Sequence, residues 1–68
     1  MNVVVNGEAR ELPDGTTVAA LLGRLDLDPA RRGVAVAVDA VVVPRGAWES
    51  HALADGMRVE ILTAIQGG

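Results

Sequence analysis

The residues best placed to do chemistry are the last four, Ile65-Gln66-Gly67-Gly68, which follow a strand-like run over residues 58–64. Glycine has no Cβ, so a Gly-Gly pair is costly to order and adds nothing to a packed core. The four residues span roughly 13–14 Å when extended, at ~3.3–3.6 Å per residue. A segment this long and thin can enter a narrow channel that leads to another protein's active site.

The reactive group of such a segment would be the α-carboxylate of Gly68. This group is ionised at neutral pH, so it can act as a nucleophile without a base. Attack on the α-phosphate of ATP would give an acyl-adenylate, and a sulfur nucleophile could then displace AMP. Phosphoryl chemistry needs magnesium and phosphate-binding donors, but the sequence has no Lys and no phosphate-binding loop. We expect a partner enzyme to supply them, with Gly68 as the modified residue and no catalytic residue in this chain.

Other reactive groups are scarce. The chain has no Cys, and His51 is the one histidine, so the sequence offers no recognisable metal site or catalytic triad. We interpret His51 as a partly exposed loop residue and expect no bound metal or cofactor. The net charge is −3 and the six basic residues are all Arg, which disfavours nucleic-acid binding because that requires a cationic surface.

The composition indicates one small domain with an aliphatic core. Of the 68 residues 50% are hydrophobic, yet Trp48 is the one aromatic residue. We predict a structured domain over residues 1–64 and a flexible tail over residues 65–68. No apolar run approaches the ~20 residues of a membrane span, and the lack of Cys fits a reducing compartment. We therefore expect a cytoplasmic protein without a membrane partner.

The first half of the sequence predicts a β-hairpin followed by a helix. Residues 1–5 and 8–12 read as strands around an Asn-Gly turn, a pair that tolerates the positive φ angles of a tight hairpin. Apolar residues at helical spacing then predict a helix that starts from an N-cap at Thr16 or Thr17 and ends near residue 25.

The second half predicts three strands. They lie at residues 34–38, 41–43 and 58–64, with a loop and a helical turn at residues 45–53. Short connections and right-handed crossovers allow the last strand to enter the sheet beside the first. The predicted fold class is therefore α+β, a β-grasp in which a mixed sheet packs on one main helix.

One face of this sheet is a candidate partner-binding surface. Side chains alternate between faces along a strand, so Val59 and Ile61 are expected to face the helix. The alternative to a binding surface is that the opposite face of the sheet is only weakly buried, which is common in small domains. The residues expected to form a small apolar surface on the opposite face, next to the tail, are Val4, Ala35, Ala37, Leu62 and Ala64.

A V-P-R-x-x-W element, an Asp-Gly pair and a final Gly-Gly follow one another at specific distances. The full set of motif residues is Asn6-Gly7, Thr17-Val18, Leu21-Leu22, Val43-Pro44-Arg45-Gly46-Ala47-Trp48, His51, Leu53, Asp55-Gly56, Arg58-Val59-Glu60-Ile61 and Gln66-Gly67-Gly68. Together they resemble the thiamine-pathway sulfur carrier family, ThiS, over essentially the whole chain. Met57 departs from the family pattern, which usually has an acidic residue there, and we expect this to alter a turn or a rim contact.

The resemblance implies a ubiquitin-like β-grasp fold and a carrier acted on by enzymes. An E1-like enzyme would adenylate the Gly68 carboxylate with ATP and Mg, and a persulfide sulfur donor would convert it to a thiocarboxylate. Thiazole synthase would then receive the sulfur. By motif, Gly67 and Gly68 are tail residues and Gly68 is the modified one.

Three alternatives share part of the pattern. Sulfur carriers of molybdopterin or cysteine synthesis share the fold and the Gly-Gly, although the Trp-containing loop and short length favour thiamine. A TGS-like RNA-binding module is similar at Leu12-Pro13-Asp14-Gly15-Thr16, but the acidic balance and lack of Lys argue against it. A protein-interaction domain with an inert tail would keep its function without Gly68, whereas a carrier would lose it.

Overall fold

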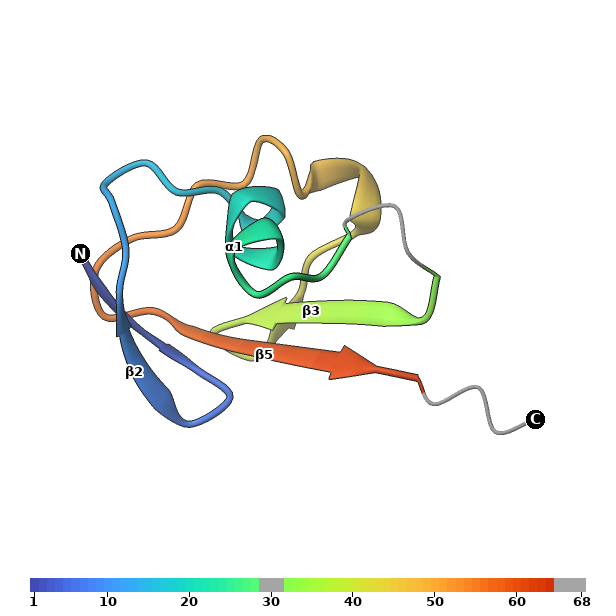
Figure 1. Ribbon diagram of the computed structural model, residues 1–68, viewed down its shortest axis with the longest axis horizontal. Coiled ribbons are helices and arrows are strands. Elements are labelled where there is room, and N and C mark those ends of the chain that lie inside the picture. The colour runs from blue at the N-terminus through green and yellow to red at the C-terminus, as the bar shows by residue number, and fades with distance from the viewer. Residues whose placement is uncertain (29–31, 65–68) are drawn as a thin grey trace.

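The computed structural model describes residues 1–28 and 32–64, which form a five-stranded mixed sheet with one α-helix on one face (Figure 1). Strand order is β2-β1-β5-β3-β4, in which β1 and β5 are parallel and the other neighbours antiparallel. The last strand thus lies in the middle of the sheet beside the first, which confirms the predicted β-grasp. The elements are β1 (Asn2–Val5), β2 (Glu8–Glu11), α1 (Val18–Arg24), β3 (Val34–Val38), β4 (Val41–Val42), the 3-10 turn η1 (Arg45–Ala47) and β5 (Arg58–Thr63).

Two tight turns close the two hairpins. Asn6 and Gly7 join β1 to β2 with φ angles of 49° and 83°, the left-handed values that the Asn-Gly pair predicted. Asp39 and Ala40 join β3 to β4 with φ angles of 49° and 68°. Ala40 is the unexpected residue, because its Cβ makes the left-handed conformation unfavourable.

Helix α1 begins at the second of the two predicted caps. Thr17 has an extended backbone, with φ −88° and ψ 169°, and its hydroxyl accepts a hydrogen bond from the N–H of Ala20 at 3.2 Å. This removes one of the unpaired donors of the first turn. The helix ends at Arg24, one residue before the predicted end, and Asp26 follows with φ 59°.

The loop between β4 and β5 covers the start of α1. The carbonyl oxygens of His51 and Trp48 accept hydrogen bonds from the N–H groups of Val18 and Ala19, both at 3.0 Å. The Trp48 indole is buried, and its Nε1 donates to the Val43 carbonyl at 2.9 Å. The Trp-containing motif is therefore a structural element that satisfies helix donors which would otherwise lack partners.

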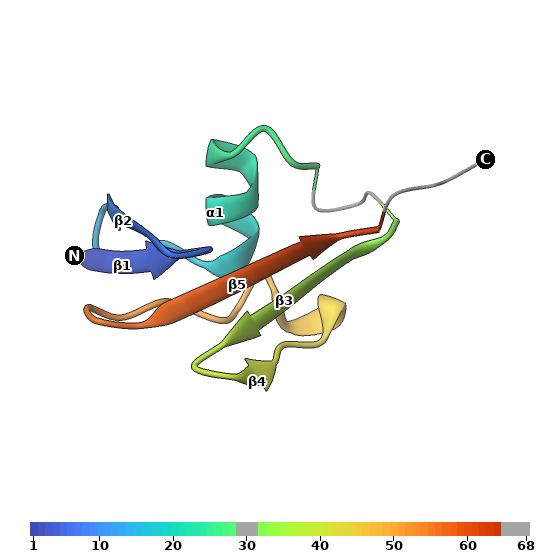
Figure 2. The same cartoon turned by 90° about the horizontal axis from the view of Figure 1, so that it is seen from below.

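The core lies between α1 and the face of the sheet that the helix covers (Figure 2). On β3 the valines are buried and the alanines between them are not, as their alternation predicted. Val59 and Ile61 of β5 are also buried, as expected. The hydrophobic core consists of Val3, Val5, Leu12, Val18, Leu21, Leu22, Val34, Val36, Val38, Val43, Trp48, Leu53, Val59 and Ile61.

The ends of the two last strands differ by one residue from those expected. β4 stops at Val42 because Val43 turns into the core, while its N–H still donates to the carbonyl of Val36 at 2.8 Å. β5 stops at Thr63. The predicted tail at residues 65–68 lies outside the described residues, so its boundary with the domain stays a prediction. In the described part of the chain, no helix is long and apolar enough to cross a membrane.

Candidate functional site

The described part of the candidate site is the end of β5, which leads to the C-terminal residues. Ala64 follows the strand, and its N–H donates to the carbonyl of Gly33 at 2.6 Å. Gly33 has φ 79°, and a Cβ placed on it would lie 3.1 Å from the Cβ of Ala64. This close approach therefore favours glycine at position 33. The predicted tail residues Ile65, Gln66 and Gly67 and the modified residue Gly68 lie outside the described residues.

The outer face of the sheet carries most of the predicted partner-binding residues. Leu62 pairs with Ala35 across β5 and β3, and Ala37 pairs with Val42 across β3 and β4. Leu62 and Val42 are 69% and 70% exposed. We call Ala35, Ala37, Val42 and Leu62 the outer apolar patch. The sequence did not indicate that Val42 belongs to this exposed surface, because the run of three valines predicted only a short strand.

Val4 does not share one continuous surface with the outer apolar patch. Val4 pairs with Arg58 on β5 and is half-buried, so Arg58 and Glu60 stand between it and Leu62 on the outer face. Two charged side chains thus interrupt the predicted apolar surface. The prediction considered only the apolar residues of this face. Ala64 is exposed beyond the end of β5.

A shallow groove lies between the β3–β4 turn and the Trp-containing loop. Its volume is about 280 Å³, and most of its lining is aliphatic. His51 sits in it as the partly exposed loop residue that the sequence predicted. Met57, the departure from the family pattern, is half-buried here, and its sulfur accepts a hydrogen bond from the N–H of Ala54 at 3.2 Å. The lining residues are Val38, Asp39, Val41, Val42, Val43, Pro44, Ala47, His51 and Met57.

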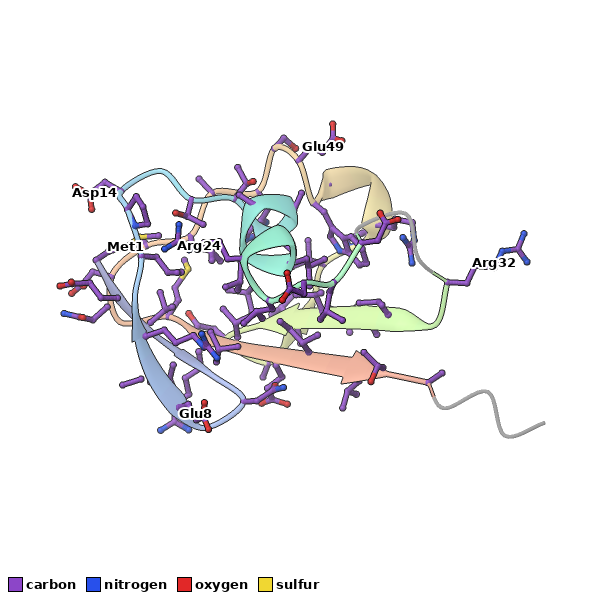
Figure 3. All side chains as sticks on the ribbon, in the orientation of Figure 1. Met1, Glu8, Asp14, Arg24, Arg32 and Glu49 are labelled. Atoms are coloured by element: carbon purple, nitrogen blue, oxygen red, sulfur yellow. The ribbon has the colours of Figure 1, made fainter. Side chains whose placement is uncertain are left out.

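The groove is lined by one acidic side chain, Asp39, and by one histidine, His51. Within residues 1–28 and 32–64, no three His, Cys, Asp or Glu side chains cluster closely enough to hold a metal ion. Among the labelled charged side chains, Glu8, Asp14, Arg32 and Glu49 lie on separate parts of the periphery (Figure 3).

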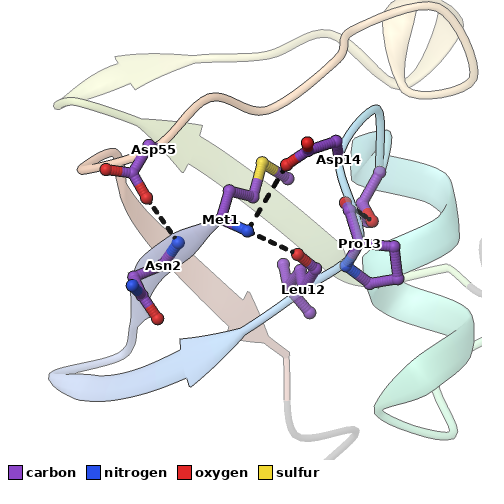
Figure 4. Close-up of polar contacts among 7 residues, drawn as sticks. Met1, Asn2, Leu12, Pro13, Asp14 and Asp55 are labelled. Atoms are coloured by element: carbon purple, nitrogen blue, oxygen red, sulfur yellow. Dashed lines mark hydrogen bonds and ion pairs between the residues drawn. The ribbon is translucent and has the colours of Figure 1, made fainter.

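The motif residues around Asp55 anchor the first strand to the turn before β5 (Figure 4). The N–H of Asn2 donates to Asp55 Oδ1 at 2.6 Å, and the N–H of Gly56 donates to the Asn2 carbonyl at 2.7 Å. The terminal amine of Met1 donates to the Leu12 carbonyl at 2.9 Å. The Asp-Gly motif therefore holds β1 and the start of β5 in register.

Arg45 of the Trp-containing motif also has a structural contact. Its guanidinium lies 4.5 Å from the centroid of the Trp48 ring, a cation–π contact that holds η1 over the edge of the core. This contact accounts for the presence of both Arg45 and Trp48 in the motif.

Comparison with known proteins identifies the family to which these motifs belong. The model of the ThiS family matches residues 3–68. The chain belongs to the ThiS family. It is 35% identical over 68 residues to the sulfur carrier protein ThiS of Escherichia coli K12, and the match covers all of both chains.

Two further comparisons support the assignment to ThiS. The whole chain is 41% identical to part of a thiazole synthase of Paramagnetospirillum magneticum, and it spans 20% of the length of that protein. The crystal and NMR structures of the thiamine biosynthesis protein ThiS of Geobacter metallireducens are each 31% identical to this chain, with TM-scores of 0.81. Each match covers all of this chain. The match covers 100% of the chain in the crystal structure and 88% of the chain in the NMR structure. The ubiquitin-like β-grasp is thus the fold of this ThiS family member.

Proposed function

We propose that this ThiS family member is a sulfur carrier of thiamine biosynthesis that holds its sulfur as a thiocarboxylate on Gly68. The observation that carries the proposal is the match, over the full length of both chains, to the sulfur carrier protein ThiS of Escherichia coli. The family match also favours the thiamine pathway over molybdopterin and cysteine synthesis and over a TGS-like module.

The proposed chemistry uses the terminal carboxylate and needs no side chain of this protein. An E1-like enzyme binds ATP and Mg, and the Gly68 carboxylate oxygen attacks the α-phosphorus so that pyrophosphate leaves. The terminal sulfur of a persulfide donor then attacks the acyl carbon and AMP leaves. A thiol cleaves the resulting S–S bond and releases the thiocarboxylate. The chain is therefore a co-substrate in our proposal, and its enzymes supply the catalytic groups.

Thiazole synthase is the proposed sulfur acceptor. A protein of that name contains a stretch 41% identical to this entire chain, which supports a reaction between the two kinds of protein. We place these steps in the cytoplasm, because a sequence without Cys fits a reducing compartment.

The outer apolar patch is the proposed docking surface for the activating enzyme. Leu62 lies one residue before the end of β5 and is 69% exposed, so a partner bound there would stand beside the strand that leads to Gly68. Contiguous patches of exposed apolar side chains are typical of interaction sites. Ala35 and Ala37 are the small neighbours that leave space for a partner's side chains, and Ala64 would lie at the rim of the contact.

Intact-mass measurement tests the proposal most directly. The protein is incubated with ATP, Mg, the E1-like enzyme and a persulfide donor, and its mass is compared with that of a variant lacking Gly68. We expect the mass gain of one oxygen replaced by sulfur, and none in the shortened variant. We expect Gly68→Ala to react more slowly, because a Cβ must fit the narrow channel. An unchanged mass with an activating enzyme that is active on another carrier would overturn the proposal.

A further inference from the structure

The side chain of Asn6 makes two hydrogen bonds to a single residue of β5. Its Oδ1 accepts from the N–H of Ile61 at 2.7 Å, and its Nδ2 donates to the carbonyl of Ile61 at 3.1 Å. The backbone N–H of Asn6 also donates to the carbonyl of Val59 at 2.9 Å. A carboxamide has the same donor and acceptor as a peptide group. The Asn6 side chain therefore extends the pairing of β1 with β5 by one step, although the main chain has already turned away.

This contact lies where β5 loses its neighbour on one side. β1 pairs with β5 only as far as Val59, because the hairpin turn follows. On the β3 side the pairing continues to Thr63, and Ala64 still bonds to Gly33. Within the described residues, the Asn6–Ile61 pair is thus the last hydrogen-bonded contact of β5 on the β1 side. Without it, the end of the strand would be bonded to β3 alone.

We propose that Asn6 is a positioning residue that sets the direction in which the chain leaves the sheet after Ile61. The inference rests on the proposed function, because the group that it directs is the Gly68 carboxylate in the activating enzyme. A strand held on both sides cannot pivot about its contacts with β3. The end of β5, from which the chain leads toward Gly68, then keeps a constant direction while the outer apolar patch is docked. Reacting groups that are misplaced by about 1 Å can lose roughly 10²-fold in rate.

The protein contains a matched control at the other end of the same strand. Asp39 has the same φ of 49° as Asn6 and also follows a strand at a two-residue turn. Its Oδ1 accepts a hydrogen bond from the N–H of Arg58 at 2.9 Å, and its own N–H donates to the Arg58 carbonyl at 2.8 Å. Asp39 thus supports β5 from a turn, as Asn6 does, but at the first residue of the strand rather than near its last.

The variants Asn6→Gly and Asp39→Gly compare the two positions. Glycine keeps the positive φ of each turn and removes the side-chain bonds to β5. Asn6→Asp is an intermediate variant, since it keeps an acceptor for the Ile61 N–H but places a carboxylate oxygen against the Ile61 carbonyl. Circular dichroism and thermal melting establish that each variant is folded at the assay temperature.

The first readout is adenylation by the E1-like enzyme, followed as ATP–pyrophosphate exchange at varied carrier concentration. We expect Asn6→Gly to lower kcat roughly 10-fold or more with KM near the wild-type value, because the docking patch is unchanged. Asn6→Asp should lie between Asn6→Gly and the wild type. Asp39→Gly should leave both constants within about twofold of wild type.

The second readout is hydrogen exchange of the free protein, which does not depend on any enzyme. We expect the amide of Ala64 to exchange faster in Asn6→Gly than in the wild type, and to be unchanged in Asp39→Gly. If the wild type is adenylated and Asn6→Gly has the same kcat, the positioning role is overturned. It is also overturned if Asn6→Gly and Asp39→Gly lose kcat to the same extent. A wild-type protein that is not adenylated at all would instead overturn the proposed function itself.

Discussion

The two faces of the same sheet differ in how far their side chains are buried. On the face toward α1, the valines of β3 are buried and join the core. On the outer face, Ala35, which lies between two of these valines, pairs with Leu62, whose side chain is 69% exposed. Neighbouring residues of a single strand are therefore buried or exposed according to their parity, and we propose that the exposed ones serve recognition. The comparison predicts that substitutions on the inner face change stability and that those on the outer face change binding.

The largest expected loss of stability comes from Leu21→Ala on the inner side. Leu21 is 0% exposed in the centre of the core, so truncation removes buried methyl groups and leaves a cavity. The free energy of unfolding should fall by about 2–5 kcal/mol, measured by urea denaturation. A fall below about 1 kcal/mol would show that the core around α1 collapses to fill the space, contrary to its close packing.

Trp48→Phe should have the next largest effect. The substitution keeps an aromatic ring but removes the Nε1 donor that bonds to the buried Val43 carbonyl at 2.9 Å. An unsatisfied buried acceptor costs about 1–3 kcal/mol, and the contact with Arg45 weakens because Trp is the better cation–π partner. Thermal melting followed by circular dichroism checks this. An unchanged melting temperature would mean that the Val43 carbonyl finds another donor.

Ala40→Gly should raise stability by about 1 kcal/mol, since Ala40 has φ 68° and glycine adopts this conformation without steric cost. The residue belongs to a turn and to neither face of the sheet. Urea denaturation measures the gain, and affinity for the activating enzyme should stay at the wild-type value. If the affinity changed along with the stability, binding would depend on residues outside the outer face, contrary to the comparison of the two faces.

Leu62→Asp should have the smallest effect on stability, within about 0.5 kcal/mol, because the side chain is largely exposed. Its effect should appear in binding, where a carboxylate in the outer apolar patch should weaken affinity for the activating enzyme roughly 10-fold or more. Ala9→Asp is the matched control, an exposed position on β2 away from the patch. Isothermal titration calorimetry with equal affinities for both variants would refute the docking role of Leu62.

Most of the fold could be predicted from local pattern. The alternation of valine and alanine predicted the inward face of β3, and the Asn-Gly pair predicted the first hairpin, because in both cases the signal depends on neighbours in sequence. The strand ends were less accurate, since tertiary contacts decide them. Val43 continues an apolar run but turns into the core beneath Trp48, which no local pattern indicates.

Less of the candidate site could be predicted. The extent of the outer apolar patch depends on register between strands, and the sequence alone did not show that Arg58 and Glu60 separate Val4 from Leu62. Asn6 was interpreted only as a turn residue because its bonds to Ile61 join positions 55 residues apart. The chemistry of Gly68, in contrast, was predicted from a motif and needs no knowledge of the fold.

The buried Trp48 gives the protein an intrinsic fluorescence that reports on its structure. It is the one Trp in a chain without Tyr or Phe, and it is 2% exposed at the junction of the core, η1 and the start of α1. Indole emission excited in the near ultraviolet therefore arises from this single place. A shift of that emission to longer wavelength reports the loss of contact between the loop and the helix, without a label.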